Sequence, residues 1–169
     1  MNFPTDSRRR PGRIALSPEL TIQLLHVHET EAGGVPRDLL ATQVRVGRLP
    51  VPVLEALKTP DLDVVTSVSI LLKILTKHAV APAIVAAMPE TVLQPVAVYH
   101  SASKTHVARA VVVLSGVLVH DQPFMASIEL DRPNVAGLAN MHWMTSAYPK
   151  ANELKFAQWE ADGLLIWAA

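Results

Sequence analysis

The feature that most constrains the fold is a succession of strand-like segments between residues 96 and 148 with no helix between them. Runs rich in β-branched, aliphatic and aromatic residues cover 96–100, 107–119, 124–130 and 141–148, and such runs are typical of β-strands. Turn-forming residues separate the later runs at Asp121-Gln-Pro123 and Asp131-Arg-Pro-Asn134. Strands that follow one another directly favour an antiparallel sheet with helices packed against it.

Helical patterns flank these strands. Apolar residues recur at helical spacing from Ile70 to Leu75, and this pattern predicts a helix that begins after Ser67 or Ser69 and ends at His78. Further helices are expected over 82–88 and 152–161, and a short strand over 164–167. The predicted fold class is therefore α+β, with N-terminal helices packed on a mainly antiparallel sheet of about four or five strands and a helix before the last strand.

The chain divides by composition into three parts. Residues 1–13 contain four arginines and one aspartate, and we expect a mobile basic tail. Residues 14–61 form an N-terminal extension with weaker patterns, and residues 62–169 form the main α+β domain. Within the extension, 20–27 fits a strand or a short helix; on a strand His26 and His28 would share a face, but no third metal ligand is suggested by spacing. We expect no metal site.

Composition and charge exclude several classes of function. Residues 14–169 contain 11 basic and 14 acidic residues, so general nucleic-acid binding by phosphate neutralisation is not expected, and any RNA contact needs a local basic cluster. The sequence contains no cysteine, which fits the cytoplasm of a producing or target cell. No apolar run is long enough to cross a membrane. No Gly-rich phosphate loop, nucleophile elbow or zincin motif is present, and no cofactor is expected.

A set of short motifs in a fixed order resembles a known family. The motifs are Ser69-x-x-x-Lys73-x-x-x-Lys77-His78, Met88-Pro-Glu-Thr-Val-Leu-Gln-Pro95, Thr145-Ser-Ala-Tyr-Pro-Lys150 and Trp159-x-x-x-Gly163-Leu-Leu-Ile-Trp167. They resemble phage- and mobile-element-associated domains of the barnase/EndoU/colicin/RelE-like nuclease superfamily, which occur in head-morphogenesis proteins and polymorphic toxins. The sequence departs from that pattern with Ala79 in place of a proline and with Pro149 inside the Tyr-x-Lys element.

The resemblance implies a metal-independent ribonuclease site. The implied catalytic residues are His78, Ser146 and Tyr148, and the implied substrate-binding residues are Lys77, Thr145 and Lys150. The dense basic stretch between His100 and Arg109 adds Arg109 as a candidate catalytic residue and Lys104 and His106 as candidate substrate-binding residues. Histidine titrates in the range that a proton carrier needs, and Ser146 and Tyr148 are two residues apart, so they share one face of a strand. The alternatives remain open: a half-buried histidine that holds a helix end, a tyrosine packed against a helix and ordinary solvated lysines explain the same residues.

The basic stretch from His100 to Arg109 is expected to be a hairpin loop that grips phosphate, or simply a solvated loop. Two functions follow from these observations. The first is a ribonuclease toxin, with RNA as substrate and an immunity protein or antitoxin as partner. The second is a non-catalytic protein-interaction module on the same scaffold. The apolar content is also compatible with a homodimer.

Overall fold

The computed structural model describes residues 15–29, 34–102, 109–133, 139–150 and 153–169. Two helices, α1 (Pro18–Glu29) and α2 (Arg37–Leu40), precede strand β1 (Gln43–Arg48). Helix α3 (Val51–Leu57), strand β2 (Asp63–Ser67) and helix α4 (Val68–Lys77) follow. The chain continues through α5 (Pro82–Ala86), α6 (Met88–Thr91), β3 (Pro95–His100), β4 (Ala110–Val119), β5 (Gln122–Arg132), β6 (Met141–Pro149), α7 (Glu153–Ala161) and β7 (Leu165–Ala168).

The strands of the described residues form one sheet of seven strands in the order β1-β2-β6-β5-β4-β3-β7. All neighbouring strands are antiparallel except β2 and β6, which are parallel. The α+β class is thus confirmed, with a helix before the last strand, but the sheet has more strands than expected. The additional width comes from β1 and from the non-local pairing of β2 with β6, which hydrophobic periodicity does not encode.

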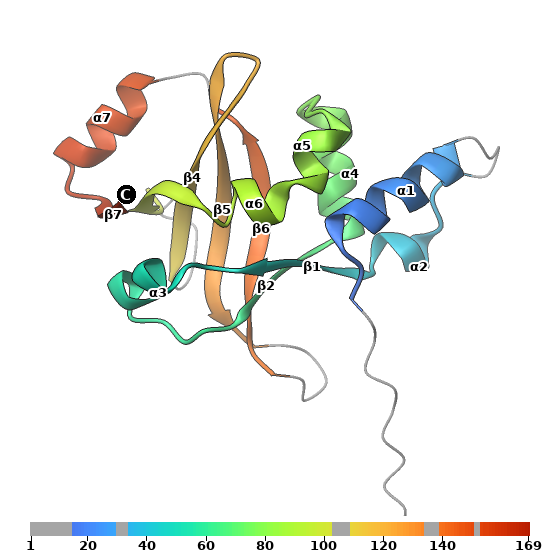
Figure 1. Ribbon diagram of the computed structural model, residues 1–169, viewed down its shortest axis with the longest axis horizontal. Coiled ribbons are helices and arrows are strands. Elements are labelled where there is room, and N and C mark those ends of the chain that lie inside the picture. Colours follow the sequence, from blue (N-terminus) through green and yellow to red (C-terminus); the bar gives the residue numbers. More distant parts are fainter. Residues whose placement is uncertain (1–14, 30–33, 103–108, 134–138, 151–152) are drawn as a thin grey trace, which may run out of the picture.

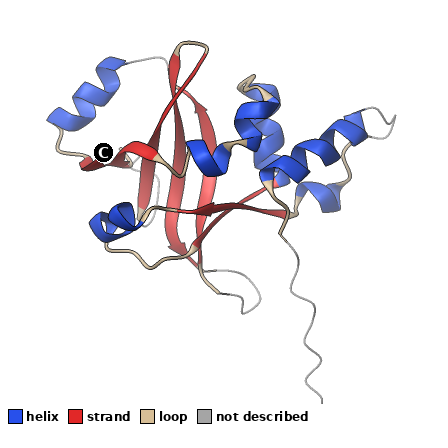
Figure 2. Cartoon of the chain, in the orientation of Figure 1, coloured by secondary structure: helices blue, strands red, loops and turns tan. Residues whose placement is uncertain are grey.

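Helices cover both faces of the sheet (Figures 1 and 2). The larger apolar cluster joins buried residues of α3 to α6 and β1, such as Val44, Val53 and Leu71, to Val113 and Ile128 of the central strands. Residues 15–61 therefore contribute to the same core as the later strands. This burial is the main source of stability, because each fully buried aliphatic side chain contributes about 1.5–3 kcal/mol.

A smaller apolar cluster lies on the opposite face, under α7. Phe156 and Trp159 pack there against Tyr99, Val112 and Met125. Side chains that alternate along β3 to β5 belong to one cluster or the other, as the two-residue period of a strand requires. Helix α7 therefore covers the β3–β5 part of this face.

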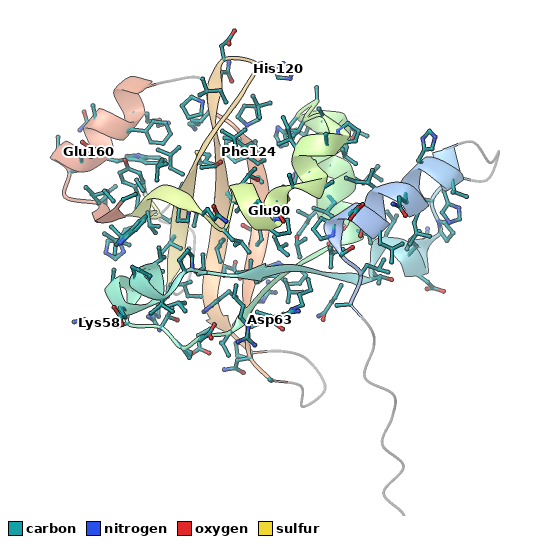
Figure 3. All side chains as sticks on the ribbon, in the orientation of Figure 1. Lys58, Asp63, Glu90, His120, Phe124 and Glu160 are labelled. Atoms are coloured by element: carbon teal, nitrogen blue, oxygen red, sulfur yellow. The ribbon has the colours of Figure 1, made fainter. Side chains whose placement is uncertain are left out.

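The hairpin between β4 and β5 sets one end of the sheet. His120 and Asp121 have φ angles of 52° and 59°, which fits the tight two-residue turn that matches the twist of antiparallel strands. His120 lies at the top of the view in Figure 3, whereas Lys58, after α3, lies at the lower left. The sheet therefore has a hairpin end and an α3 end, and the candidate residues divide between them.

Candidate functional site at the hairpin end of the sheet

His78 is positioned by the way α4 begins and ends. Ser67 caps the helix by accepting a hydrogen bond from the Ile70 amide at 3.4 Å, and Leu71 and Ile74 anchor its apolar face in the core. His78 is the C-terminal cap, and Ala79 follows in the left-handed conformation with φ 50°. This reversal ends the helix, as in many C-caps.

The turn after His78 does not accommodate the proline that the resemblance led us to expect at position 79. Proline is restricted to φ near −65°, so it does not fit a residue with φ 50°. The Ala79 carbonyl lies 3.0 Å from His120 Nε2, at the tip of the β4–β5 hairpin. Ala79 therefore sets the helix end and links it to the hairpin, and His120 is a neighbour that the sequence patterns did not single out.

The imidazole of His78 stacks on the ring of Tyr148. Their ring centroids are 5.4 Å apart and the planes are inclined by 29°. Helix α4 continues from β2, the parallel neighbour of β6, and therefore runs beside the second half of β6. This continuation brings together residues that are seventy positions apart in the sequence.

Lys150 lies against the ring of Tyr148, which also stacks with His78. Its Nζ is 5.7 Å from the centroid of the Tyr148 ring, a cation–π distance. Partial burial, followed by the charge and hydrogen bond of neighbouring Lys155, lowers the pKa of Lys150. Two lysines side by side are an arrangement that an anion stabilises.

The charge around His78 favours its neutral form. Desolvation first, and then the positive charges of Lys77 and Lys73, lower the pKa of His78 below 6.5. Both lysines are exposed on α4. At neutral pH the imidazole is therefore available to accept a proton, while cations stand nearby to balance negative charge.

Ser146 and Thr145 extend the group along β6. Ser146 pairs with Ser127 and Tyr148 pairs with Met125 across the β5–β6 ladder, so Ser146 shares its sheet face with Tyr148. Thr145 falls at an irregularity in this ladder, and its hydroxyl donates to the Ser127 carbonyl at 3.3 Å. Ser146 is thus placed beside the His78–Tyr148 pair, whereas the Thr145 hydroxyl is engaged with the backbone.

Arg109 is not brought to this group. Its guanidinium donates to the carbonyls of Leu57 at 2.8 Å and Lys58 at 3.1 Å, at the α3 end of the sheet. By the strand register, Arg109 is level with Leu130 and Tyr148 with Met125, so the two residues lie about 17 Å apart along the strands. These hydrogen bonds of Arg109 cap the C-terminal end of α3, where backbone carbonyls lack helical partners. Lys104 and His106, two further basic residues of the expected loop, lie outside the described residues.

A second histidine that the patterns did not single out is entirely buried at the α3 end. His142 is 0% exposed, accepts a hydrogen bond at Nδ1 from the Asp131 amide at 3.1 Å, and lies with Nε2 3.0 Å from the Pro60 carbonyl. These partners define a neutral imidazole with the proton on Nε2. Desolvation is the main reason that the pKa of His142 is lowered. Its contacts are those of a structural histidine.

A hollow of about 310 Å³ also lies at the α3 end, beside the edge of β1 and β2. Arg45 and Arg48 line it and form ion pairs with Asp63 at 2.8 and 3.0 Å, and Arg48 also pairs with Asp61 at 3.1 Å. The charges of this hollow are therefore balanced. The basic group at the hairpin end has a different character.

Neither metal ligation nor a membrane span is indicated in the described part of the chain. No cluster of three or more histidine, aspartate or glutamate side chains is arranged for a metal ion among the described residues. His26 and His28 lie on α1, a helix, so they do not share the face that a strand would have given them. No helix among the residues that the structure describes has the length and apolarity needed to cross a membrane.

The seven-stranded sheet with helices on both faces defines an α+β domain. The family model of the phage MuF C-terminal domain matches residues 73–169, which is more than half of the chain. The chain therefore belongs to this family. Comparison with curated proteins and with solved structures finds no match.

Proposed function

We propose that this phage-associated domain is a metal-independent ribonuclease of the toxin type, with its active site at the hairpin end of the sheet. The observation that carries the proposal is the stack of His78 on Tyr148 with Lys150 against the same ring. An imidazole and an ammonium group thus lie against one phenol ring, and they supply a proton acceptor, a cation and a hydroxyl. RNA cleavage without a metal needs these three kinds of group.

The geometry supports the following reaction. The neutral imidazole of His78 takes the proton from a ribose 2′-hydroxyl, and the freed oxygen attacks the adjacent phosphorus. The bond from phosphorus to the 5′ oxygen breaks, and that oxygen takes a proton from the Lys150 ammonium, whose lowered pKa makes it a better donor. The products are a 2′,3′-cyclic phosphate and a 5′-hydroxyl.

Hydroxyl and cationic groups have separate roles in this scheme. The Tyr148 hydroxyl, and Ser146 on the same face, donate to the non-bridging phosphate oxygens, whose negative charge grows in the transition state. Lys77, next to His78 in the chain, adds positive charge outside the stack. Arg109 has no part in this site, because its guanidinium is bound to the end of α3.

The purified chain is tested on a fluorescently labelled single-stranded RNA. The wild type is expected to cleave it, and His78→Ala and Tyr148→Ala are expected to reduce the rate by about 10²–10⁴-fold, the range for loss of a general base. His26→Ala is the matched control, because His26 is an exposed histidine on α1 and is not among the residues of the proposed site. Equal rates for wild type and His78→Ala contradict the proposal.

An inactive wild type would leave the non-catalytic interaction module as the function of this scaffold. Expression in a bacterial host separates the two functions inside a cell. A toxic wild type together with a harmless His78→Ala variant supports cleavage in the host cytoplasm. For a toxin, we further propose an immunity protein or antitoxin with an acidic surface, because the site it must cover presents Lys73, Lys77, Lys150 and Lys155.

A further inference from the structure

The sheet face that carries Tyr148 continues towards the α3 end as a row of partly exposed side chains. Cross-strand pairing places Trp143 opposite Glu129 and Ser146 opposite Ser127 on this face. The alternate side chains, such as Met144, point into the large core. Tyr148, Ser146 and Trp143 therefore form a line along one strand, β6.

Trp143 lies outside the two apolar clusters of the described residues. It is half-buried, whereas Trp159 of α7 is buried with Tyr99 and Phe156. Helix α7 packs over the β3–β5 side of the face, and Trp143 lies on β6, next to β2. A large aromatic side chain is thus left partly accessible on a sheet.

Arg132 lies against this tryptophan. Its guanidinium carbon is 5.3 Å from the centroid of the Trp143 ring, and its Nη1 atom is 3.2 Å from a carboxylate oxygen of Glu129. The ion pair orients the guanidinium beside the ring. A tryptophan and an arginine held together in this way offer flat surfaces on which a nucleic-acid base stacks.

Charge distinguishes the two ends of this face. Around Trp143, arginines and carboxylates are paired, both at Arg132–Glu129 and at the hollow where Arg45 meets Asp63. That hollow is close by, because Val65, one of its lining residues, is the cross-strand partner of Trp143. The charge-balanced end therefore suits uncharged bases, and the lysine-rich end at Tyr148 suits phosphate.

We propose that Trp143, supported by Arg132, is a base-stacking platform, so that an unpaired RNA strand lies along β6 with its scissile phosphate at His78 and Tyr148. This assignment rests on the proposed function and specifies its substrate as single-stranded. The register separates Trp143 from Tyr148 by about 13 Å, a span for a short stretch of strand. Paired bases in a duplex are stacked on one another and do not present their faces to such a platform.

The experiment measures binding of the full chain to a fluorescent 2′-O-methyl oligonucleotide, which lacks the attacking hydroxyl and is not cleaved. Trp143→Ala is expected to weaken binding by about 5- to 150-fold, the effect of losing one stacked base. Trp143→Phe, which keeps an aromatic face, is expected to lose less, and Arg132→Gln to weaken binding with the fold intact. Trp167→Phe, on β7, is the matched control.

The outcomes separate the platform from the nuclease. RNA cleavage by the wild type, together with unchanged binding in Trp143→Ala and Arg132→Gln, overturns the platform and leaves the proposed function. Binding that depends on Trp143, without any cleavage of ordinary RNA, overturns the nuclease and supports the platform. A duplex of the same sequence that binds as tightly as the single strand, or the absence of any binding, also overturns the platform.

Discussion

His142→Phe is the substitution for which the structure gives the most definite stability effect. The ring of phenylalanine is of similar size but makes neither hydrogen bond. The Asp131 amide and the Pro60 carbonyl therefore lose their partner at two part-buried contacts with His142, which is itself 0% exposed. Each unsatisfied buried group costs about 1–3 kcal/mol. For the two groups together we expect a loss of about 2–6 kcal/mol in the free energy of unfolding, a large part of a domain's usual stability.

Urea unfolding at pH 7.5 or above measures this loss, with an unchanged m-value as the sign that the unfolding reaction is the same. His142→Asn is expected to lose less, because its carbonyl oxygen can still accept from the Asp131 amide. His100→Ala, at an exposed site, should stay within about 0.5 kcal/mol of the wild type. A loss below about 1 kcal/mol for His142→Phe refutes the account of this histidine.

The same residue predicts a pH dependence. The pKa of His142 is lower in the folded chain than its ordinary value of 6.5. As the pH falls below 6.5, His142 therefore becomes protonated in the unfolded chain at a higher pH than in the folded chain. Stability is then fully present above pH 6.5 and falls as the pH decreases towards the folded pKa, by at most about 1.4 kcal/mol per pH unit for this group. His142→Phe should lessen this fall, and an unchanged slope would contradict the assignment.

Three further predictions concern the turn after α4, the contact of Arg109 with α3 and the proposed active site. Ala79→Pro should destabilise the fold by about 1–3 kcal/mol or more in urea unfolding, because proline cannot adopt φ 50°. Ala79→Gly, which adopts this angle without strain, should be neutral or stabilising. Equal stabilities of the two variants would contradict the left-handed conformation at position 79. Arg109→Met should cost about 1–3 kcal/mol but leave the cleavage rate per folded molecule unchanged, and a loss of rate in folded protein would return Arg109 to the site. Lys77→Ala should raise the pKa of His78 and so move the acidic limb of the pH–rate profile to higher pH; a limb that stays in place would show that Lys77 does not act on His78.

Local patterns predicted the elements that depend on neighbouring residues. The helix that ends at His78, the strands from residue 96 to 148 and the final helix and strand all follow from periodicity and turn residues, and the structure confirms them. The segment 20–27, left open between strand and helix, lies within α1. These elements could be predicted because their signals lie within a few residues of one another.

Features that depend on distant pairing could not be predicted in the same way. The parallel pairing of β2 with β6 brings His78 to Tyr148. In the sequence, only the resemblance carried by the ordered motifs indicated that these two residues belong to one site. Arg109 was grouped with these residues because it lies in the densest basic stretch, yet its side chain is used by α3. His142 was not singled out because burial with two backbone partners leaves no pattern in the sequence around it.

The rate of RNA cleavage by wild type and by His78→Ala, measured on the same labelled single strand and with product ends identified, tests the central claim most directly. We expect 2′,3′-cyclic phosphate ends from the wild type, and a rate at least about a hundredfold lower for the variant. Equal rates, or no cleavage by a folded wild type, would contradict it.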